Sequence, residues 1–211
     1  MMEIIPGILE KDWAEIERKI NLVLPFAKTI HIDIIDGKFA PNTTFLDPAP
    51  FKKYANDVFL ELHMMVENPI QYLKPWADAG FRRFIGHIEK MPDQVEFVAQ
   101  GQLLGEVGLA LDGPTSLDQM KVPLDDLDNI FFYTSERVGF SGPPFLPEKL
   151  SKLREIRGKN LTIPIEVDGG INEKTIVLTK NAGANRFAAT SAIYKGGNPR
   201  EQYKKLVNLI K

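Results

Sequence analysis

The chain has 211 residues, of which 44% are hydrophobic and 26% charged, and this composition is typical of a globular protein. Its formal net charge is −2 and no run of Lys or Arg exceeds two residues, which argues against a nucleic-acid or anionic-membrane partner. The absence of Cys excludes disulfides and thiolate chemistry. Because no apolar run of about 20 residues and no leader-like start are present, we expect a cytoplasmic protein without a membrane span.

Eight apolar runs rich in β-branched and aromatic residues predict strands, and an amphipathic stretch after each run predicts a helix. The predicted strands cover residues 3–9, 29–35, 58–66, 83–88, 107–111, 129–134, 162–167 and 185–189. The predicted helices cover residues 12–28, 48–56, 69–79, 92–104, 116–127, 147–157, 173–181 and 199–211. The strand runs are nearly continuous in Val, Ile, Leu and Phe, which indicates parallel strands covered on both faces.

Strict alternation of strand and helix over eight units predicts an α/β fold, namely a (β/α)8 TIM barrel. A doubly wound open sheet is the alternative that the same alternation allows. No Gly/Ser-rich linker or shift in composition divides the chain, so we expect residues 1–211 to form one barrel domain. In a barrel of this kind the active site lies at the carboxyl ends of the strands, and polar residues there are the candidates for chemistry.

Polar side chains that end the predicted strands form a candidate metal site. His31 and Asp33 are two residues apart on one strand, so their side chains leave the same face. His63 ends the next strand and Asp168 ends the seventh. Two imidazoles and two carboxylates suit one divalent ion such as Zn, Fe, Mn or Co. Histidines satisfied by hydrogen bonds within the core are the alternative interpretation, and His87, at the end of the fourth strand, has no assigned role.

Glycine-rich loops after the last three predicted strands form a candidate phosphate site. Glycine permits close approach of the backbone, and backbone N–H groups at such loops bind phosphate in barrels. Tight turns without a ligand are the alternative. The candidate residues are Gly139, Phe140, Ser141, Gly142, Gly169, Gly170, Thr190 and Ser191. Met65 is interpreted first as a core residue, although its sulfur could contact the site.

Several strings of residues, in order along the chain, carry a resemblance to a known family. They cover residues 5–9, 31–42, 62–66, 167–171, 182–184 and 191–193. The most specific is His-Ile-Asp-Ile-Ile-Asp-Gly-Lys-Phe-Ala-Pro-Asn at residues 31–42. Together these strings resemble the ribulose-phosphate 3-epimerase family over essentially the full length of the chain.

The resemblance implies an isomerase of the pentose phosphate pathway that interconverts ribulose 5-phosphate and xylulose 5-phosphate. It implies one divalent metal ion held by His31, Asp33, His63 and Asp168. It also implies that Asp33 and Asp168 are the acid and base, which move a proton at C3 through an enediolate that the metal stabilises. The ligand would be a small-molecule sugar phosphate, and a homo-oligomer is expected.

Residues around the expected substrate depart from the family's usual pattern. Gly7 stands where the family has Ser, and we keep it as a candidate substrate-contacting position; Ile35 replaces Met and Lys38 replaces His. Thr190 stands where the family has Gly, and the loop at residues 136–143 differs, with Arg137 as a candidate anion contact.

These departures leave three alternatives to the pentulose-phosphate epimerase. The first is a 3-epimerase of a hexulose 6-phosphate such as allulose 6-phosphate, and the second is a catalytically idle barrel that binds a phosphorylated ligand. A decarboxylase or aldolase barrel ranks last, because Lys38 lies in a loop and no lysine stands among the strand-end carboxylates.

Overall fold

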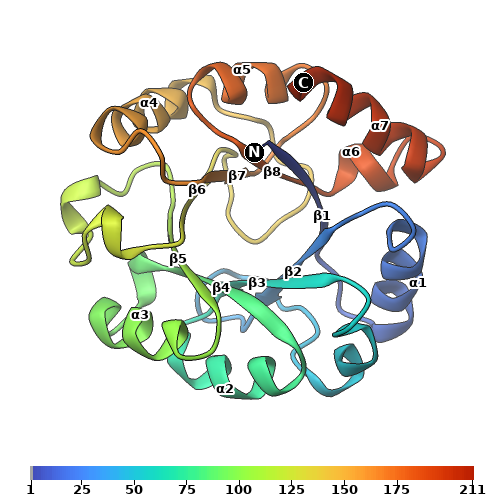
Figure 1. The fold of residues 1–211 in the computed structure, drawn as a ribbon, viewed down its shortest axis with the longest axis horizontal. Helices are drawn as coiled ribbons and strands as arrows, with labels where there is room; N and C mark the ends of the chain where they lie inside the picture. Colours follow the sequence, from blue (N-terminus) through green and yellow to red (C-terminus); the bar gives the residue numbers. More distant parts are fainter. Residues whose placement is uncertain (1) are drawn as a thin grey trace.

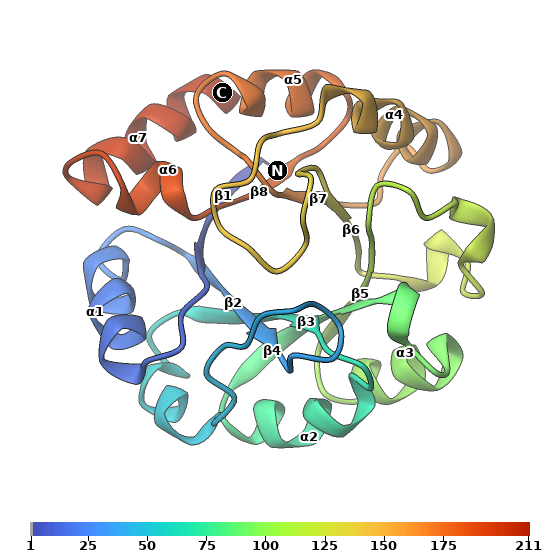
Figure 2. The same cartoon turned by 180° about the vertical axis from the view of Figure 1, so that it is seen from behind.

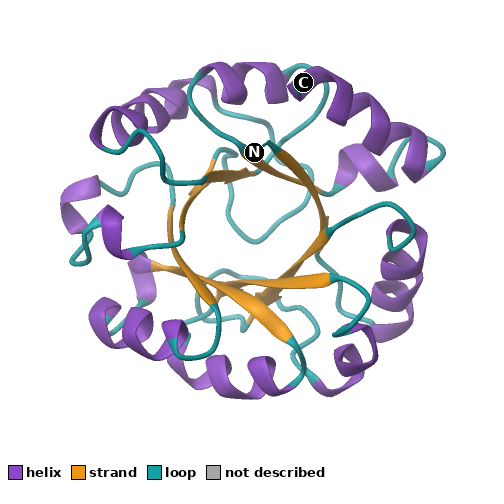
Figure 3. Ribbon diagram, viewed as in Figure 1, coloured by secondary structure: helices purple, strands orange, loops and turns teal. Residues whose placement is uncertain are grey.

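A computed structural model describes residues 2–211 and contains a closed barrel of parallel strands surrounded by helices (Figures 1 and 3). Neighbouring strands follow chain order from β1 to β8, and β8 pairs with β1 to close the barrel. The predicted (β/α)8 barrel is therefore confirmed, and the open sheet is excluded. The strands are β1 (Glu3–Ile8), β2 (Thr29–Ile35), β3 (Phe59–Met65), β4 (Phe81–His87), β5 (Glu106–Leu111), β6 (Asn129–Tyr133), β7 (Ile165–Asp168) and β8 (Arg186–Ala189).

The α-helices pack around the outside of the barrel. They are α1 (Trp13–Val23), α2 (Ile70–Asp78), α3 (Gln94–Gln102), α4 (Leu150–Lys159), α5 (Thr175–Asn181), α6 (Ser191–Tyr194) and α7 (Pro199–Ile210). Short 3-10 turns are η1 (Ala49–Tyr54), η2 (Ile88–Lys90), η3 (Leu117–Gln119), η4 (Leu124–Asp126) and η5 (Pro147–Lys149). Among residues 2–211, no helix has the length and apolar character needed to cross a membrane.

Two of the predicted helices are wrong in type. Residues 116–127 form the separate turns η3 and η4 rather than one helix, with Pro123 immediately before η4. Proline lacks an N–H group and its ring clashes with the preceding turn, so a continuous helix cannot run through this position. Residues 48–56 contain only the 3-10 helix η1, whose first turn carries proline.

Aromatic side chains between the barrel and its helices illustrate how the outer core is packed. Phe51 of η1 lies 5.4 Å, between ring centroids, from Trp76 of α2 and 5.3 Å from Phe81 of β4. All three side chains are fully buried. Burial of large aromatic surface here stabilises the wall of the barrel that carries β2, β3 and β4.

The register of the strands decides which side chains face the barrel interior. Asp33 pairs with His63, and Gly7 pairs with His31. Paired residues on neighbouring parallel strands share a face, so these positions all face the interior. Phe131 packs there against the His31 and His63 rings, with centroids 5.7 Å and 4.3 Å away, and limits their freedom to rotate.

The segment between β6 and η5, residues 134–146, projects across one opening of the barrel, and we call it the mouth loop (Figure 2). Hydrogen bonds hold its two arms together: Leu146 N donates to Thr134 O at 2.9 Å, and Glu136 N donates to Pro144 O at 3.2 Å. Its tip is joined to the loop after β2, because Asn42 Nδ2 donates to Gly139 O at 2.7 Å. The mouth loop thus covers the carboxyl ends of the strands.

Candidate active site

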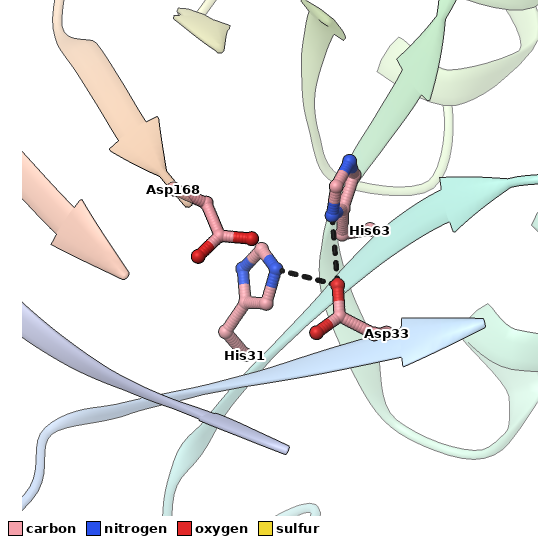
Figure 4. Close-up of side chains that lie close together, drawn as sticks. All are labelled: His31, Asp33, His63 and Asp168. Atoms are coloured by element: carbon pink, nitrogen blue, oxygen red, sulfur yellow. Dashed lines mark hydrogen bonds and ion pairs between the residues drawn. The ribbon is translucent and has the colours of Figure 1, made fainter. Parts of the chain in front are cut away.

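Four side chains from three strands meet beneath the mouth loop (Figure 4). Strand β2 contributes His31 and Asp33, β3 contributes His63, and β7 contributes Asp168, each with one ligand atom within 4.8 Å of the others. Asp33 Oδ1 lies 3.2 Å from His31 Nε2 and 2.8 Å from His63 Nδ1. The barrel therefore brings together all four residues predicted as metal ligands.

The ring of His31 is oriented by a buried carboxylate. His31 Nδ1 lies 2.5 Å from Glu61 Oε1, so Nδ1 carries a proton and Nε2 is the ring nitrogen that faces the cluster. Glu61 is in turn ion-paired with the buried guanidinium of Arg83. A carboxylate behind a histidine in this way fixes the ring and raises its basicity as a metal ligand.

A second chain of contacts supports His63. Its Nε2 lies 2.9 Å from His87 Nε2, and His87 Nδ1 lies 3.1 Å from Glu89 Oε2. With Nδ1–H of His87 donating to Glu89, His87 Nε2 accepts from His63, and His63 Nδ1 is left facing Asp33. The position of His87 at a strand end was the only sequence signal for this contact.

The two aspartates sit in unlike electrostatic environments. Burial favours the neutral form of Asp33, but the neighbouring His31 and His63 outweigh this effect and lower the pKa of Asp33. Removal from water, together with the nearby charge of Asp33, raises the pKa of Asp168 to about 7. Two carboxyl groups so close cannot both ionise easily unless a cation lies between them.

The imidazoles also differ from each other. Burial opposes protonation of His31, yet the carboxylates of Asp33, Glu166 and Glu61 raise its pKa well above the ordinary value. Burial dominates at His63 and lowers its pKa to about 4, so this ring is neutral at physiological pH.

The donor set fits a divalent metal ion. The outer nitrogens of His31 and His63 are taken up by Glu61 and His87, which leaves one nitrogen of each ring facing the two carboxylates. Two imidazole nitrogens with two carboxylate oxygens are ligands that first-row metals prefer. A cation held there would also lower the cost of keeping both aspartates ionised.

A narrow cavity adjoins the cluster and contains Asp33 and Asp168. Its volume is about 30 Å³, far below the roughly 300 Å³ or more of ligand pockets. Seven of the predicted phosphate-site residues line it, namely Phe140, Ser141, Gly142, Gly169, Gly170, Thr190 and Ser191. The lining that the sequence analysis did not assign consists of Leu9, Tyr133, Ile171 and Ala188. Alternation of inward positions at the end of β6 could have indicated Tyr133.

Three predicted contact residues lie outside this lining. Met65 is buried in a small apolar cluster with Ile35 and Ala40. Gly139 supports the mouth loop through its contact with Asn42. The interior space at Gly7 is filled by another side chain, because a Cβ built on Gly7 would lie 2.6 Å from Thr190 Oγ1.

Glycine is required where β7 ends. Gly169 and Gly170 have φ values of 97° and 73°, in the left-handed region that side chains disfavour. A Cβ on Gly169 would also lie 2.7 Å from Ser135 N. Thr134 Oγ1 donates to Asp168 O at 2.8 Å and to Gly169 O at 2.6 Å, which ties the turn to the base of the mouth loop.

The sequence matches a family model, "Ribulose-phosphate 3 epimerase family", over residues 3–194. The chain belongs to the ribulose-phosphate 3-epimerase family. This is a family of isomerases that act on a sugar phosphate.

Curated relatives agree with this assignment. The ribulose-phosphate 3-epimerase of Schizosaccharomyces pombe is 32% identical, over 99% of this chain and 93% of the relative. That of Bacillus subtilis is 34% identical over 92% and 93%, respectively. A relative from Oryza sativa, named as a cytoplasmic isoform, is 32% identical over 94% and 90%.

Solved structures of other sugar-phosphate proteins share the fold. KGPDC from Streptococcus mutans superposes with a TM-score of 0.76 at 13% identity, covering 99% of this chain and 97% of the other. The 3-hexulose-6-phosphate synthase from Salmonella typhimurium gives 0.75 at 14% identity, covering 99% and 98%. At such low identity these similarities establish the barrel fold alone.

The departures from the family's usual residues fall in different places. Ile35 is fully buried behind the site. Lys38 is exposed, and its Nζ lies 3.4 Å from Glu67 Oε2. Arg137 is exposed on the mouth loop and stacks over Phe140, 4.4 Å from the ring centroid. Of the substituted positions, Gly7 and Thr190 are the pair that meet each other at the cavity.

Proposed function

We propose that this family member is a metal-dependent 3-epimerase that interconverts ribulose 5-phosphate and xylulose 5-phosphate. The observation that carries the proposal is the pair of carboxyl groups, Asp33 from β2 and Asp168 from β7, which line one cavity beside two imidazoles. The names of the curated relatives from Schizosaccharomyces pombe and Bacillus subtilis support the choice of substrate.

In this proposal His31, Asp33, His63 and Asp168 hold the metal ion. A divalent ion bound there supplies Lewis-acid stabilisation of the negative charge that develops on the substrate oxygens. Glu61 and His87 keep the two imidazoles turned toward the cluster through their contacts with His31 and His63.

Epimerisation at C3 removes a proton next to the C2 carbonyl and returns a proton to the opposite face. Two groups on opposite faces are therefore needed, and we assign this task to Asp33 of β2 and Asp168 of β7. In one direction one aspartate accepts the C3 proton while the other donates a proton to the opposite face. The roles are exchanged in the reverse direction.

The glycine loops would bind the phosphate. Backbone N–H groups around Gly142, Gly169 and Gly170, with the Ser191 hydroxyl, form the anion-binding wall of the cavity. Holding the phosphate at this end fixes the sugar so that C3 lies between the two aspartates. The mouth loop then excludes water from the enediolate.

A hexulose 6-phosphate is the second candidate substrate. The altered positions Gly7 and Thr190 lie beside the cavity, and they favour considering a different sugar chain. Comparison of kcat/KM for ribulose 5-phosphate and allulose 6-phosphate separates the two candidates. Cytoplasmic residence and assembly into a homo-oligomer belong to the same proposal.

The decisive experiment is NMR of metal-reconstituted protein with ribulose 5-phosphate in D2O. We expect deuterium at C3 together with the appearance of xylulose 5-phosphate. Exchange without the second epimer would mean that only one of the two aspartates works as proposed. Absence of both signals with this sugar and with allulose 6-phosphate would leave a phosphate-binding barrel without turnover.

Replacement of Asp168 by Asn tests the assigned roles. D168N should lower kcat by about 10³-fold or more, because it removes an acid–base group and a charged metal ligand. The control is D57N, which changes an exposed aspartate outside the cavity and should retain full turnover. Near-normal turnover of D168N would refute the role of Asp168.

A further inference from the structure

Side chains from the ends of β1 and β8 would occupy the same space at the edge of the cavity. Pro6 pairs with Ala189, so the next residues, Gly7 and Thr190, are neighbours on the interior face. A Cβ on Gly7 would lie 2.6 Å from Thr190 Oγ1, closer than real Cβ contacts allow. A side chain at Gly7 would therefore force the Thr190 hydroxyl to move, and in this chain the side chain at this place comes from Thr190, directly after β8.

The Thr190 hydroxyl is not used by the local helix. Thr190 stands at the N-cap of α6, where a Thr side chain ordinarily accepts from the backbone N–H of the first turn. No such bond is formed. The side chain instead lines the cavity that contains Asp33 and Asp168, where its hydroxyl can both donate and accept.

We infer that Thr190 is a substrate-binding residue whose hydroxyl bonds a sugar oxygen of the ketose phosphate, in the place that Gly7 leaves open. The inference rests on the proposed function, and it identifies Thr190 as a residue that determines which sugar phosphate is bound. The two positions are thus linked: glycine at position 7 leaves the room that the Thr190 side chain occupies.

Four single variants test the inference in the full-length, metal-loaded protein. T190V keeps the shape but removes the hydroxyl, and kcat/KM should fall about tenfold or more, mainly through KM. T190S restores the hydroxyl and should recover most of this loss. G7A places a methyl group against the Thr190 hydroxyl and should cause a loss similar to that of T190V. T162V, in an exposed loop at the other end of the barrel, should leave kcat/KM unchanged.

Double variants test whether the two positions act as one. G7A/T190A should be no worse than T190A alone, because the Thr190 Cβ would lie 3.8 Å from the new Cβ at position 7 and the hydroxyl is already absent. G7S/T190G should recover activity relative to T190G, because a hydroxyl re-enters the same space from β1. Melting temperatures of all variants separate loss of binding from loss of fold.

Binding measurements distinguish this inference from the proposed function. Calorimetry with ribulose 5-phosphate should show weaker binding to T190V, while the affinity for inorganic phosphate should not change. Equal weakening for both ligands would place the hydroxyl on the phosphate and overturn the assignment, as would wild-type kcat/KM in T190V. If the wild-type protein binds the sugar phosphate without epimerising it, the proposed function fails, and the comparison of affinities still decides the role of Thr190.

Discussion

We expect Glu61 to influence how strongly His31 binds a metal, although Glu61 does not belong to the proposed ligand set. Its carboxylate lies 2.5 Å from His31 Nδ1 and also pairs with Arg83. Loss of a carboxylate behind a metal-binding histidine typically costs about 10- to 100-fold in metal affinity. We therefore expect E61Q to bind the divalent ion by about that factor more weakly, as measured by competition with a chelator.

E61Q also leaves the buried guanidinium of Arg83 without the carboxylate of Glu61, and this loss is expected to destabilise the folded protein. E61D provides the second test, because it keeps the charge for Arg83 but shortens the reach to His31. E61D should fold and still lose metal affinity. The matched control, E155Q on an exposed turn of α4, should bind the metal as the wild-type protein does. Unchanged affinity in folded E61D would contradict the role of Glu61.

For individual residues, the sequence could predict which side chains form the candidate metal site, but not all of the residues that contact those side chains. The two-residue spacing of His31 and Asp33 and the strand-end positions of His63 and Asp168 were enough to predict the cluster. The contact between His63 and His87 depends on the relative register of β3 and β4, which has no signature in either strand alone.

The mouth loop is the element that controls access to the site. The cavity beneath it, about 30 Å³, is small for a sugar phosphate, and we expect the loop to move when substrate enters. Its tip is held closed by the hydrogen bond from Asn42 Nδ2 to Gly139 O. Loops of this kind sequester the reaction from water, and their closure can influence both kcat and KM.

We expect N42A to loosen the closed form of the mouth loop. Amide hydrogen exchange at residues 137–142 should become faster, and kcat/KM should fall about 3- to 10-fold, as the loss of one hydrogen bond implies. The control N208A removes an exposed amide on α7, far along the chain from the loop, and should change neither quantity. Unchanged exchange in N42A would mean that this bond does not hold the loop.

Helices and strands could be predicted where the sequence pattern that specifies them lies within the element itself. Continuous apolar runs marked every strand, because both faces of a barrel strand are covered. Residues 116–127 have an amphipathic pattern, yet Pro123 interrupts it and the chain forms two short turns. The path of the mouth loop could not be predicted, because it depends on contacts such as Asn42 with Gly139 between distant segments.

At the scale of the whole molecule, closure of the barrel places ionisable side chains from far apart in the sequence in one interior. Glu166 from β7 lies beside Glu61 from β3 and His31 from β2, and all three are fully buried. Alternation along a strand indicates which residues face inward, but only the closed barrel decides which of them become neighbours. The electrostatics of the interior are therefore a property of the fold rather than of any one motif.

This interior should make the stability of the metal-free protein depend on pH. Burial and the charge of Glu61 raise the pKa of Glu166 to about 8, and burial and the charge of Asp33 raise that of Asp168 to about 7. In the unfolded chain both groups titrate at about 4, so from about pH 4 up to their folded-state pKa values the folded chain holds protons that the unfolded chain has lost. The stability that these protons contribute is complete below the unfolded-state pKa and is lost as pH rises through the folded-state values. His63, with its pKa lowered to about 4, opposes this trend only below the unfolded histidine value of about 6.5.

We therefore expect the free energy of unfolding of chelator-treated protein to fall by about 1 kcal/mol or more per pH unit between about pH 6.5 and 7.5, where His63 no longer opposes the trend and about one proton or more is still retained, each accounting for about 1.4 kcal/mol per unit. Urea titrations at a series of pH values measure it directly. E166Q/D168N keeps both positions neutral and should make the dependence less steep, with the remaining slope coming from His31, whose raised pKa also retains a proton in the folded chain, whereas E155Q should keep the wild-type slope. A free energy that rises with pH in the wild-type protein would mean that Glu166 and Asp168 are ionised in the folded barrel, with a compensating positive charge beside them.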